Sequence, residues 1–422
     1  MRILVLGSGA REHAIILALR AEAAPHDVFA APGNAGIARD AEIVALDPLD
    51  PGAVTDYAND ANIDLVVIGP EAPLVAGVAD ALREHGIPVF GPGRAAAQLE
   101  GSKAFAKRIM DAAGVPTGRA VHARTSAEVA AALDDLGAPY VVKADGLAAG
   151  KGVLVTTDRD AALAHAELYL PTGPVLIEEF LDGPEVSLFF VSDGDAVRAL
   201  SPAQDFKRAL DGDAGPNTGG MGAYSPLPWL TERFGSEAAF VELVTNEVAL
   251  PVVRQLDAEG TPFIGLLYAG LIVTDTGVKV IEFNARFGDP ETQVVLPRLV
   301  SPLSELLAAA ASGHLEDLPQ PVFAEATAVT VVLASEGYPE APRTGRPLGG
   351  VEAAAEVEGV HIAHAATAAA GEELLATGGR VLSVVAVGTT LAQSRTRAYT
   401  AIERITLEGS HFRTDIAAGA AE

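Results

Sequence analysis

The sequence predicts an α/β protein of two or three domains that begins with a doubly wound parallel sheet. Three observations support this prediction. The chain has 422 residues, which is long for a single domain. Over its first quarter, short apolar runs that end in glycine alternate with stretches of helical spacing, the βαβ pattern of a parallel sheet. Near residue 320 the pattern changes to alternating strands, which indicates a separate and smaller α+β unit.

The first domain is expected to span residues 1–102. Its strands are predicted from the apolar runs RILVLG (2–7), DVFAAP (27–32), IDLVVIG (63–69) and IPVF (87–90). Helices between them are predicted from the spacing in REHAIILALRAEA (11–23) and VAGVADALREHG (75–86). Strands that alternate with helices in this way form a parallel sheet with helices on both faces.

The second domain is expected to span residues 103–320. It begins with a helix that Ser102 caps, and a hairpin is predicted where LLYAGLIVT and VKVIEFN flank a short turn. Between them lie short strands in APYVVKADG, KGVLVTT, GPVLIEEFL and EVSLFFVSDGD. The polar, glycine-rich stretch 204–226 is predicted to be a long loop, and such loops in compact enzymes are usually functional or mobile. Residues 321–422 are expected to form the third domain, with a long helix predicted in TLAQSRTRAYTAIERITL (390–407).

Composition narrows the class of protein. The formal net charge of −27 argues against nucleic acids and anionic membranes as partners. The chain has no cysteine, which excludes disulfides, thiolate metal sites and a cysteine nucleophile and agrees with a cytoplasmic protein. The apolar start MRILVLGSGA is too short for a signal peptide, and no apolar stretch is long enough for a membrane span. Among the histidines, His13 is expected to pack or cap, and His361 and His364 to lie at the surface.

Lysine is rare in this chain, so a lysine beside a glycine-rich loop is informative. The six lysines are Lys103, Lys107, Lys143, Lys151, Lys207 and Lys279. The segment VVKADGLAAGKGV contains Gly-x-x-x-Gly-Lys-Gly, which is one residue short of a P-loop and lacks its Ser or Thr. A strand pattern follows, so we predict a hairpin loop whose backbone N–H groups and Lys151 close over phosphates. An ordinary glycine hairpin is the alternative.

The strands on either side of this loop carry further candidates for a nucleotide site. Lys143 shares a strand face with Val141 and can reach phosphate oxygens, whereas a buried unpaired lysine would be costly. Downstream, IEEFL (177–181) ends a strand where an adenine could lie against a backbone edge. Glu185 could accept hydrogen bonds from ribose hydroxyls. Each of these glutamates alone is more often a surface charge.

A second strong signal is the strand and turn in VIEFNARFGDPET. Glu282 and Asn284 are two residues apart, so both side chains point to one face, while Ile281 and Phe283 are expected to face the core. Carboxylate and amide oxygens suit Mg²⁺ that bridges nucleotide phosphates. An arginine on the same side could bind a phosphate, and an aspartate follows in a tight Gly-Asp-Pro turn. The polar face of an edge strand is the alternative.

These residues, in this order, resemble the ATP-grasp superfamily and, within it, the glycinamide ribonucleotide synthetase family. The matching segments extend nearly end to end and are GSGAREHA (7–14), APGNAG (31–36), GPEAPLV (69–75), QLEGSKAF (98–105), KADGLAAGKGV (143–153), GPNTGGMGAYSP (215–226) and EFNARFGDPETQ (282–293). The resemblance implies an ATP-grasp central domain with a mobile lid over about 118–190. It also implies the second step of purine biosynthesis, in a monomer, with glycine, 5-phosphoribosylamine and ATP as substrates and glycyl phosphate as intermediate.

The resemblance further implies roles for individual residues. ATP would be bound by Lys103, Lys143, Gly150, Gly152, Glu178, Phe180 and Glu185. The metal ion, Mg²⁺ or Mn²⁺, would be held by Glu282 and Asn284. Catalysis would depend on Arg286, Asp289 and Lys151. The other substrates would be contacted by Glu12, Glu71, Thr218, Gly219, Gly220, Met221, Asp289 and Arg380, with Asp205 shaping the glycine pocket.

Three other functions remain open at this point. An NAD-dependent oxidoreductase is suggested by Gly7-Ser8-Gly9 after the first strand, but the third glycine of that fingerprint is Glu12 here. The second strand also ends without an acid for the ribose, so we interpret the turn as one that brings Glu12 to the substrate. An ATP-grasp carboxylase acting on bicarbonate would lack the GPNTGGMGAYSP segment. A non-catalytic ATP sensor is disfavoured because the lysines and the metal pair are both present.

Overall fold

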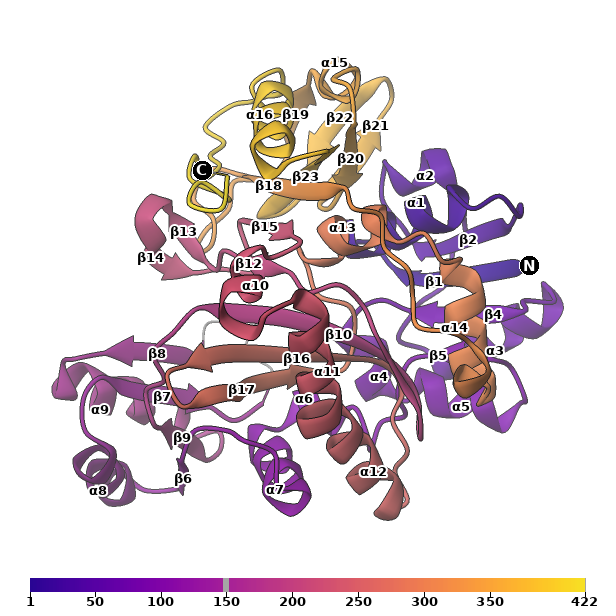
Figure 1. Cartoon of the computed structure of the whole chain (residues 1–422). Helices are drawn as coiled ribbons and strands as arrows, with labels where there is room; N and C mark the ends of the chain where they lie inside the picture. The colour runs from indigo at the N-terminus through magenta and orange to yellow at the C-terminus, as the bar shows by residue number, and fades with distance from the viewer. Residues whose placement is uncertain (147–151, 422) are drawn as a thin grey trace.

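The computed structural model describes residues 1–146 and 152–421 (Figure 1). Its N-terminal part, indigo and purple in Figure 1, contains a five-stranded sheet in the order β3-β2-β1-β4-β5. The strands are β1 (Arg2–Gly7), β2 (Asp27–Pro32), β3 (Glu42–Ile43), β4 (Leu65–Ile68) and β5 (Val89–Phe90). All neighbouring pairs are parallel, which confirms the prediction from the alternating pattern. The order reverses between β1 and β4, where α/β sheets form ligand crevices.

Helices pack on this sheet, and its central strands β1 and β4 are buried, whereas the edge strand β3 is exposed. The helices are α1 (Ala10–Arg20), α2 (Ile37–Asp40), α3 (Pro51–Asp60), α4 (Glu71–Ala76) and α5 (Val78–Glu84). Residues 3–6 of β1 have no exposed surface, as expected for a strand that is covered on both sides. The helix α1 contributes Ile15, Ile16 and Leu19 to the core.

The segment predicted to be a lid forms an antiparallel sheet in the order β6-β9-β7-β8. Its elements are β6 (Ala120–Ala123), α8 (Ser126–Leu136), β7 (Tyr140–Ala144), β8 (Val153–Thr156), α9 (Arg159–Tyr169) and β9 (Val175–Glu178). The strands β7 and β8 pair antiparallel, as the hairpin prediction requires. Val129, Leu133 and Val142 belong to a small hydrophobic core that is separate from the rest of the protein. This segment is therefore a packing unit of its own.

The second central sheet is antiparallel, in the order β11-β10-β16-β17. Its strands are β10 (Glu185–Asp193), β11 (Val197–Ala199), β16 (Ile264–Thr274) and β17 (Gly277–Asn284). The helices of this region are α6 (Gln98–Gly101), α7 (Lys103–Ala113), α10 (Trp229–Phe234), α11 (Glu237–Val244), α12 (Leu250–Ala258), α13 (Thr292–Val295) and α14 (Leu303–Ser312). The hydroxyl of Ser102 accepts a hydrogen bond from the N–H of Phe105, so the predicted cap is confirmed. None of the helices in the described part of the chain is long and apolar enough to cross a membrane.

The predicted hairpin β16–β17 is present, but it contains a β-bulge. Gly270 pairs with Glu282, whereas the next residue of β16 pairs with Val280, so Ile281 is the extra residue. Val280 and Phe283 are buried, while Ile281 is only partly buried. The prediction that Ile281 faces the core is therefore wrong, because the bulge interrupts the alternation of faces.

The C-terminal part is built on a sheet in the order β12-β15-β18-β23-β20. Its strands are β12 (Gln204–Asp205), β15 (Gly222–Ser225), β18 (Thr327–Ala334), β20 (Val360–His364) and β23 (Arg380–Gly388). The other elements are β13 (Arg208–Leu210), β14 (Ala214–Asn217), β19 (Arg346–Gly349), α15 (Val351–Ala355), β21 (Thr367–Ala370), β22 (Glu373–Ala376), α16 (Leu391–Ile402) and β24 (Thr406–Leu407). The glycine-rich segment 204–226 is not simply a loop, because it holds four short strands. Two of them, β12 and β15, extend the C-terminal sheet and so join the central part to it (Figure 1).

Candidate active site

A buried ion-pair cluster lies where the lid segment meets α7. Lys143 on β7 places its ammonium group 2.6 Å from the carboxylate of Glu178, at the end of β9. Lys107 of α7 lies 3.2 Å from the other oxygen of the same carboxylate. Burial alone would raise the pKa of Glu178, but the two lysines outweigh burial and lower it. Two ammonium groups on one carboxylate leave a net positive charge, which suits an anionic ligand.

Lys103 lies beside this cluster, at the first turn of α7. Its ammonium group donates to the carbonyl of Gly146, and its backbone N–H donates to Asp145 at 2.7 Å. Burial lowers the pKa of Lys103, and the nearby carboxylate of Glu282 opposes that effect. Gly152 is buried and its carbonyl accepts from Ala144. The predicted residues Gly150 and Lys151 lie outside the described part of the chain.

The predicted ribose ligand Glu185 also carries a lysine partner. Its carboxylate pairs with Lys207, which lies next to β12, and this pairing lowers the pKa of Glu185. Phe180, the predicted neighbour of the adenine, is 40% exposed. Lys279 lies 3.7 Å from Glu179.

All five described lysines therefore surround one region of the molecule. Lys107 and Lys207 were not assigned to a site from the sequence. Their rarity was the signal that could have identified them, because the rest of the positive charge is arginine.

The predicted metal ligands Glu282 and Asn284 share a face of β17, as expected. They pair with Gly270 and Tyr268, which are two residues apart on β16. A Cβ atom at Gly270 would lie 3.2 Å from the side chain of Glu282, so the glycine leaves room for it. In the described part of the chain, carboxylates and imidazoles form no group of three or more that could hold a metal ion alone. A pair of hard oxygen ligands fits Mg²⁺ that completes its shell with phosphate oxygens and water.

Arg286 is held by two carboxylates that come from the N-terminal side of the chain. Its guanidinium lies 3.0 Å from Glu100 and 3.7 Å from Glu71. Burial would lower the pKa of Arg286, but these carboxylates outweigh burial and raise it. Burial raises the pKa of Glu100. Sequence reasoning missed Glu100, although it lies inside the segment QLEGSKAF.

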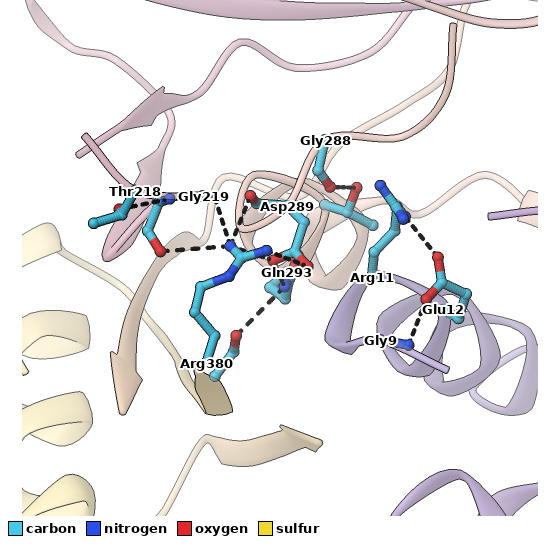
Figure 2. Close-up of polar contacts among 12 residues, drawn as sticks. Gly9, Arg11, Glu12, Thr218, Gly219, Gly288, Asp289, Gln293 and Arg380 are labelled. Atoms are coloured by element: carbon cyan, nitrogen blue, oxygen red, sulfur yellow. Dashed lines mark hydrogen bonds and ion pairs between the residues drawn. The ribbon is translucent and has the colours of Figure 1, made fainter. Parts of the chain in front are cut away.

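Arg380 and Asp289, which were predicted separately, are brought together with the Gly219–Gly220 loop (Figure 2). The guanidinium of Arg380 pairs with the carboxylate of Asp289 at 3.1 Å and donates to the carbonyl of Gly219 at 2.6 Å. The amide of Gln293 donates to the same carboxylate at 2.8 Å. Arg380 thus links the first residue of β23 to two loops of the central domain.

Thr218 and Met221, which flank Gly219 and Gly220, are both buried, although residues that contact a substrate were expected here. Thr218 donates to the carbonyl of Lys207 through both its N–H and its hydroxyl, at 2.7 and 2.9 Å. Met221 has no exposed surface, and its N–H donates to the carbonyl of Phe206. Met221 therefore supports the loop from beneath. Asp205 lies in β12 next to these residues, and burial, opposed by Lys207, raises its pKa to about 7.

Glu12 does not project into an open crevice. Its carboxylate accepts from the N–H of Gly9 and from Arg11, both at 2.6 Å (Figure 2). A Cβ atom at Gly69 would lie 2.2 Å from this carboxylate, and one at Gly7 would lie 2.5 Å from its stem. The glycines of the turn therefore make space for a buried helix-capping side chain. That side chain fills the place where a dinucleotide would need to approach the backbone.

The prediction that His364 lies at the surface is wrong. Its side chain is 3% exposed, and its backbone N–H donates to the ring of His13 at 2.8 Å. His13 also contacts the carboxylate of Asp40 at 3.0 Å. Burial, with a smaller effect of His13, lowers the pKa of His364 to about 4, and burial lowers the pKa of His361 to a similar value. The alanine-rich sequence around His364 did not indicate that the last three residues of β20 are buried.

Comparison with known proteins covers the whole chain. Three family models match in order, described as the N domain, the ATP-grasp (A) domain and the C domain of phosphoribosylglycinamide synthetase, over residues 1–100, 101–292 and 328–419. A phosphoribosylamine–glycine ligase from Leifsonia xyli is 71% identical over the full length of both chains.

Two solved structures are also similar to this chain. A phosphoribosylamine–glycine ligase from Thermotoga maritima has a TM-score of 0.81 and 34% identity over 99% of this chain and all of its own. The biotin carboxylase domain of 2-oxoglutarate carboxylase from Hydrogenobacter thermophilus, solved with MgADP and bicarbonate, has a TM-score of 0.71. It is 17% identical over 97% of this chain and 91% of that one, so this likeness concerns the fold.

Proposed function

The chain belongs to the phosphoribosylglycinamide synthetase family, and we propose that the site described above joins glycine to 5-phosphoribosylamine while ATP is converted to ADP and phosphate. This is the second step of purine biosynthesis. The observation that carries the proposal is the ligase relative at 71% identity over the full length. This similarity to a ligase over the whole chain disfavours both the oxidoreductase and the bicarbonate-dependent carboxylase as alternatives. An ATP sensor is disfavoured by the complete set of lysines and oxygen ligands.

The chemistry requires that the carboxylate of glycine be activated. Transfer of the γ-phosphoryl group of ATP to this carboxylate gives glycyl phosphate, whose phosphate is a good leaving group. The amine of 5-phosphoribosylamine then attacks the acyl carbon, and phosphate departs as the amide forms. No covalent enzyme intermediate is needed, which suits a chain without cysteine. The protein contributes positioning, positive charge and exclusion of water.

The lysine cluster provides the positive charge for ATP. Lys143, Lys103 and Lys107 bind the phosphates, and Lys143 exchanges its bond to Glu178 for phosphate oxygens when the nucleotide enters. Glu178, Phe180 and Glu185 frame the adenine and the ribose. The segment of about 118–190 closes over the nucleotide as a lid, and Gly152 binds ATP. The separate core of this segment supports a movement of the whole unit.

Glu282 and Asn284 would hold Mg²⁺ or Mn²⁺, and the ion would supply positive charge that offsets the charge of the phosphates. Arg286 is kept charged by Glu100 and Glu71 and lies two residues after Asn284, so it stabilises charge on the transferred phosphoryl group.

The second substrate enters where the N-terminal, central and C-terminal domains meet, with boundaries at 1–102, 103–320 and 321–422. Asp289, Arg380 and the loop of Thr218–Gly220 contact glycine and phosphoribosylamine, because their polar groups converge there (Figure 2). Glu71 and the turn of Glu12 border the same entrance. Arg380 can release Asp289 to bind the ribose 5-phosphate. We further propose that the protein acts as a cytoplasmic monomer.

The test is release of ADP by the purified protein with MgATP and glycine, with and without 5-phosphoribosylamine prepared from ribose 5-phosphate and ammonia. ADP that appears only with both substrates supports the ligase. ADP that appears with bicarbonate instead would refute the substrate assignment and leave the ATP-grasp fold intact.

A further inference from the structure

Arg413, near the C-terminus, is the largest fully buried side chain and carries a charge. It is 1% exposed, and burying an unpaired guanidinium would be strongly unfavourable. Its Nε and Nη2 atoms form a bidentate pair with Asp415 at 2.7 and 2.6 Å. Its Nη1 atom lies 2.7 Å from the carboxylate of Asp213, which is two hundred residues away in the sequence. This arrangement joins the end of the chain to the central glycine-rich segment.

The partner of Arg413 belongs to a hairpin that has little other support. The strands β13 and β14 pair only with each other in a two-stranded sheet, and residues 210–216 are exposed. An isolated two-stranded hairpin is at best marginally stable in water. Further bonds from the C-terminal segment hold its tip, since Gly212 donates to Asp415 and Thr414 donates to Asp211, both at 2.8 Å. Figure 1 shows the end of the chain, in yellow, next to β13.

The base of this hairpin adjoins two residues of the proposed site, Glu185 and Thr218. Lys207 precedes the hairpin and pairs with Glu185, and Thr218 follows it and donates twice to the carbonyl of Lys207. Arg413 contacts the residues on both sides of Lys207. Its guanidinium stacks on the ring of Phe206 with 4.9 Å to the centroid, and it donates to the carbonyl of Arg208 at 3.2 Å. Arg413 therefore restrains the chain on both sides of Lys207.

We propose that Arg413 is a positioning residue for the ligation reaction, which acts by holding Lys207 and Thr218 in place. The inference rests on the proposed function for the reaction that is measured. Its geometric basis, a buried guanidinium that brackets Lys207 and anchors the adjoining hairpin, is independent of the substrate. The C-terminal segment thus completes a site whose charged groups belong to the central domain.

The experiment compares Arg413→Met with Arg397→Met. Arg397 is another arginine of the C-terminal domain, partly buried and paired with Glu358 at 3.0 Å, and its described contacts do not include the hairpin. We expect Arg413→Met to lower kcat by roughly tenfold to a hundredfold, because small displacements of aligned groups have large effects. Arg397→Met should keep kcat close to wild type. Arg413→Lys, which retains charge and loses the bidentate fork, should recover part of kcat.

Arg413→Met could lower kcat by displacing Lys207 or by a general loss of stability. A double-mutant cycle separates these two explanations, because a loss of stability alone would not depend on Lys207. In a Lys207→Met background, Arg413→Met should lower kcat by less than about threefold, because coupled residues are not additive. Full multiplication of the two effects would overturn the proposal. Asp213→Asn covers the case in which Arg413→Met does not fold, since Asp213 is 67% exposed. It should lower kcat and leave the melting temperature nearly unchanged, and wild-type kcat in this variant would also overturn the proposal.

Failure of the proposed function would be seen separately, as absence of ADP formation by the wild-type protein. In that case hydrogen–deuterium exchange still decides the structural claim. Faster exchange over residues 206–218 in Arg413→Met than in Arg397→Met would support it. Equal exchange in the two variants would refute it.

Discussion

Replacing Lys143 by methionine is the most direct test of the proposal that the lysine cluster binds ATP. The substitution removes the ammonium group and keeps most of the apolar stem. Lys107 remains 3.2 Å from Glu178, so the carboxylate still has a partner. We therefore expect the variant to fold, with a smaller loss of stability than the roughly 3–5 kcal/mol that follows when a buried charge is left alone.

The magnitude of the effect on ATP follows from the bond that is lost. A hydrogen bond to a charged group is worth about 1.5–3 kcal/mol, which corresponds to a Kd raised by about 10- to 150-fold. At a nucleotide concentration about 100 times the wild-type Kd, binding stabilises the wild-type protein by about 2.7 kcal/mol. At the same concentration the variant would gain only about 1.4 to 0.3 kcal/mol.

The assay is the free energy of unfolding with and without a slowly hydrolysed ATP analogue and Mg²⁺, in the absence of glycine. Lys279→Met is the matched control, because Lys279 is a more exposed lysine at 3.7 Å from Glu179. It should keep most of the nucleotide-dependent stabilisation. Full stabilisation of Lys143→Met by the analogue would refute the role of Lys143 in binding phosphates.

Three further predictions concern the metal pair, the histidines and the N-terminal turn. Glu282→Ala should raise the Mg²⁺ concentration required for half-maximal ADP release, and an unchanged requirement would exclude Glu282 as a ligand. The pKa of His364 is depressed to about 4, so the stability that it contributes is present above pH 6.5 and is lost as the pH falls towards 4. A melting-temperature profile of His364→Gln should be flatter than wild type over this range. Gly69→Ala should lower the free energy of unfolding by about 1–3 kcal/mol, since its Cβ would collide with Glu12. Gly101→Ala, where a Cβ meets nothing within 4 Å, should have little effect in the same denaturation experiment.

Much of the fold could be predicted because the pattern of apolar residues follows local geometry. The buried run in β1 and the hairpin β16–β17 are examples. Ile281 shows where this fails, because a bulge depends on the pairing of two strands and leaves no mark in the alternation itself. The prediction of a loop over 204–226 missed four short strands for a similar reason. Two of them complete a sheet whose other strands begin more than a hundred residues later.

The site could be predicted as a set of residue types but not as a set of partners. The order of motifs made Lys143, Glu178 and Glu185 candidates for ATP binding, yet nothing in the sequence indicated that the first two form an ion pair. Arg380 and Asp289 were predicted independently, and their contact depends on the packing of β23 against the turn at Pro290. Glu12 was expected to face a ligand. Its actual environment depends on Gly69, which comes from a different strand–helix connection.

The net negative charge of the protein explains why the ion pairs between lysines and carboxylates matter for the proposed function. The protein carries a formal net charge of −27, so its overall field repels a nucleotide triphosphate rather than attracting it. Binding of ATP at the proposed site must therefore depend on local contacts with the five described lysines and their neighbours. Burial lowers the pKa of Lys103 and Lys107, and neighbouring carboxylates oppose this loss of charge. Glu178 thus has two roles under the proposed function, since it opposes the loss of charge on Lys107 in the free protein and is the partner of Lys143 that phosphate would replace.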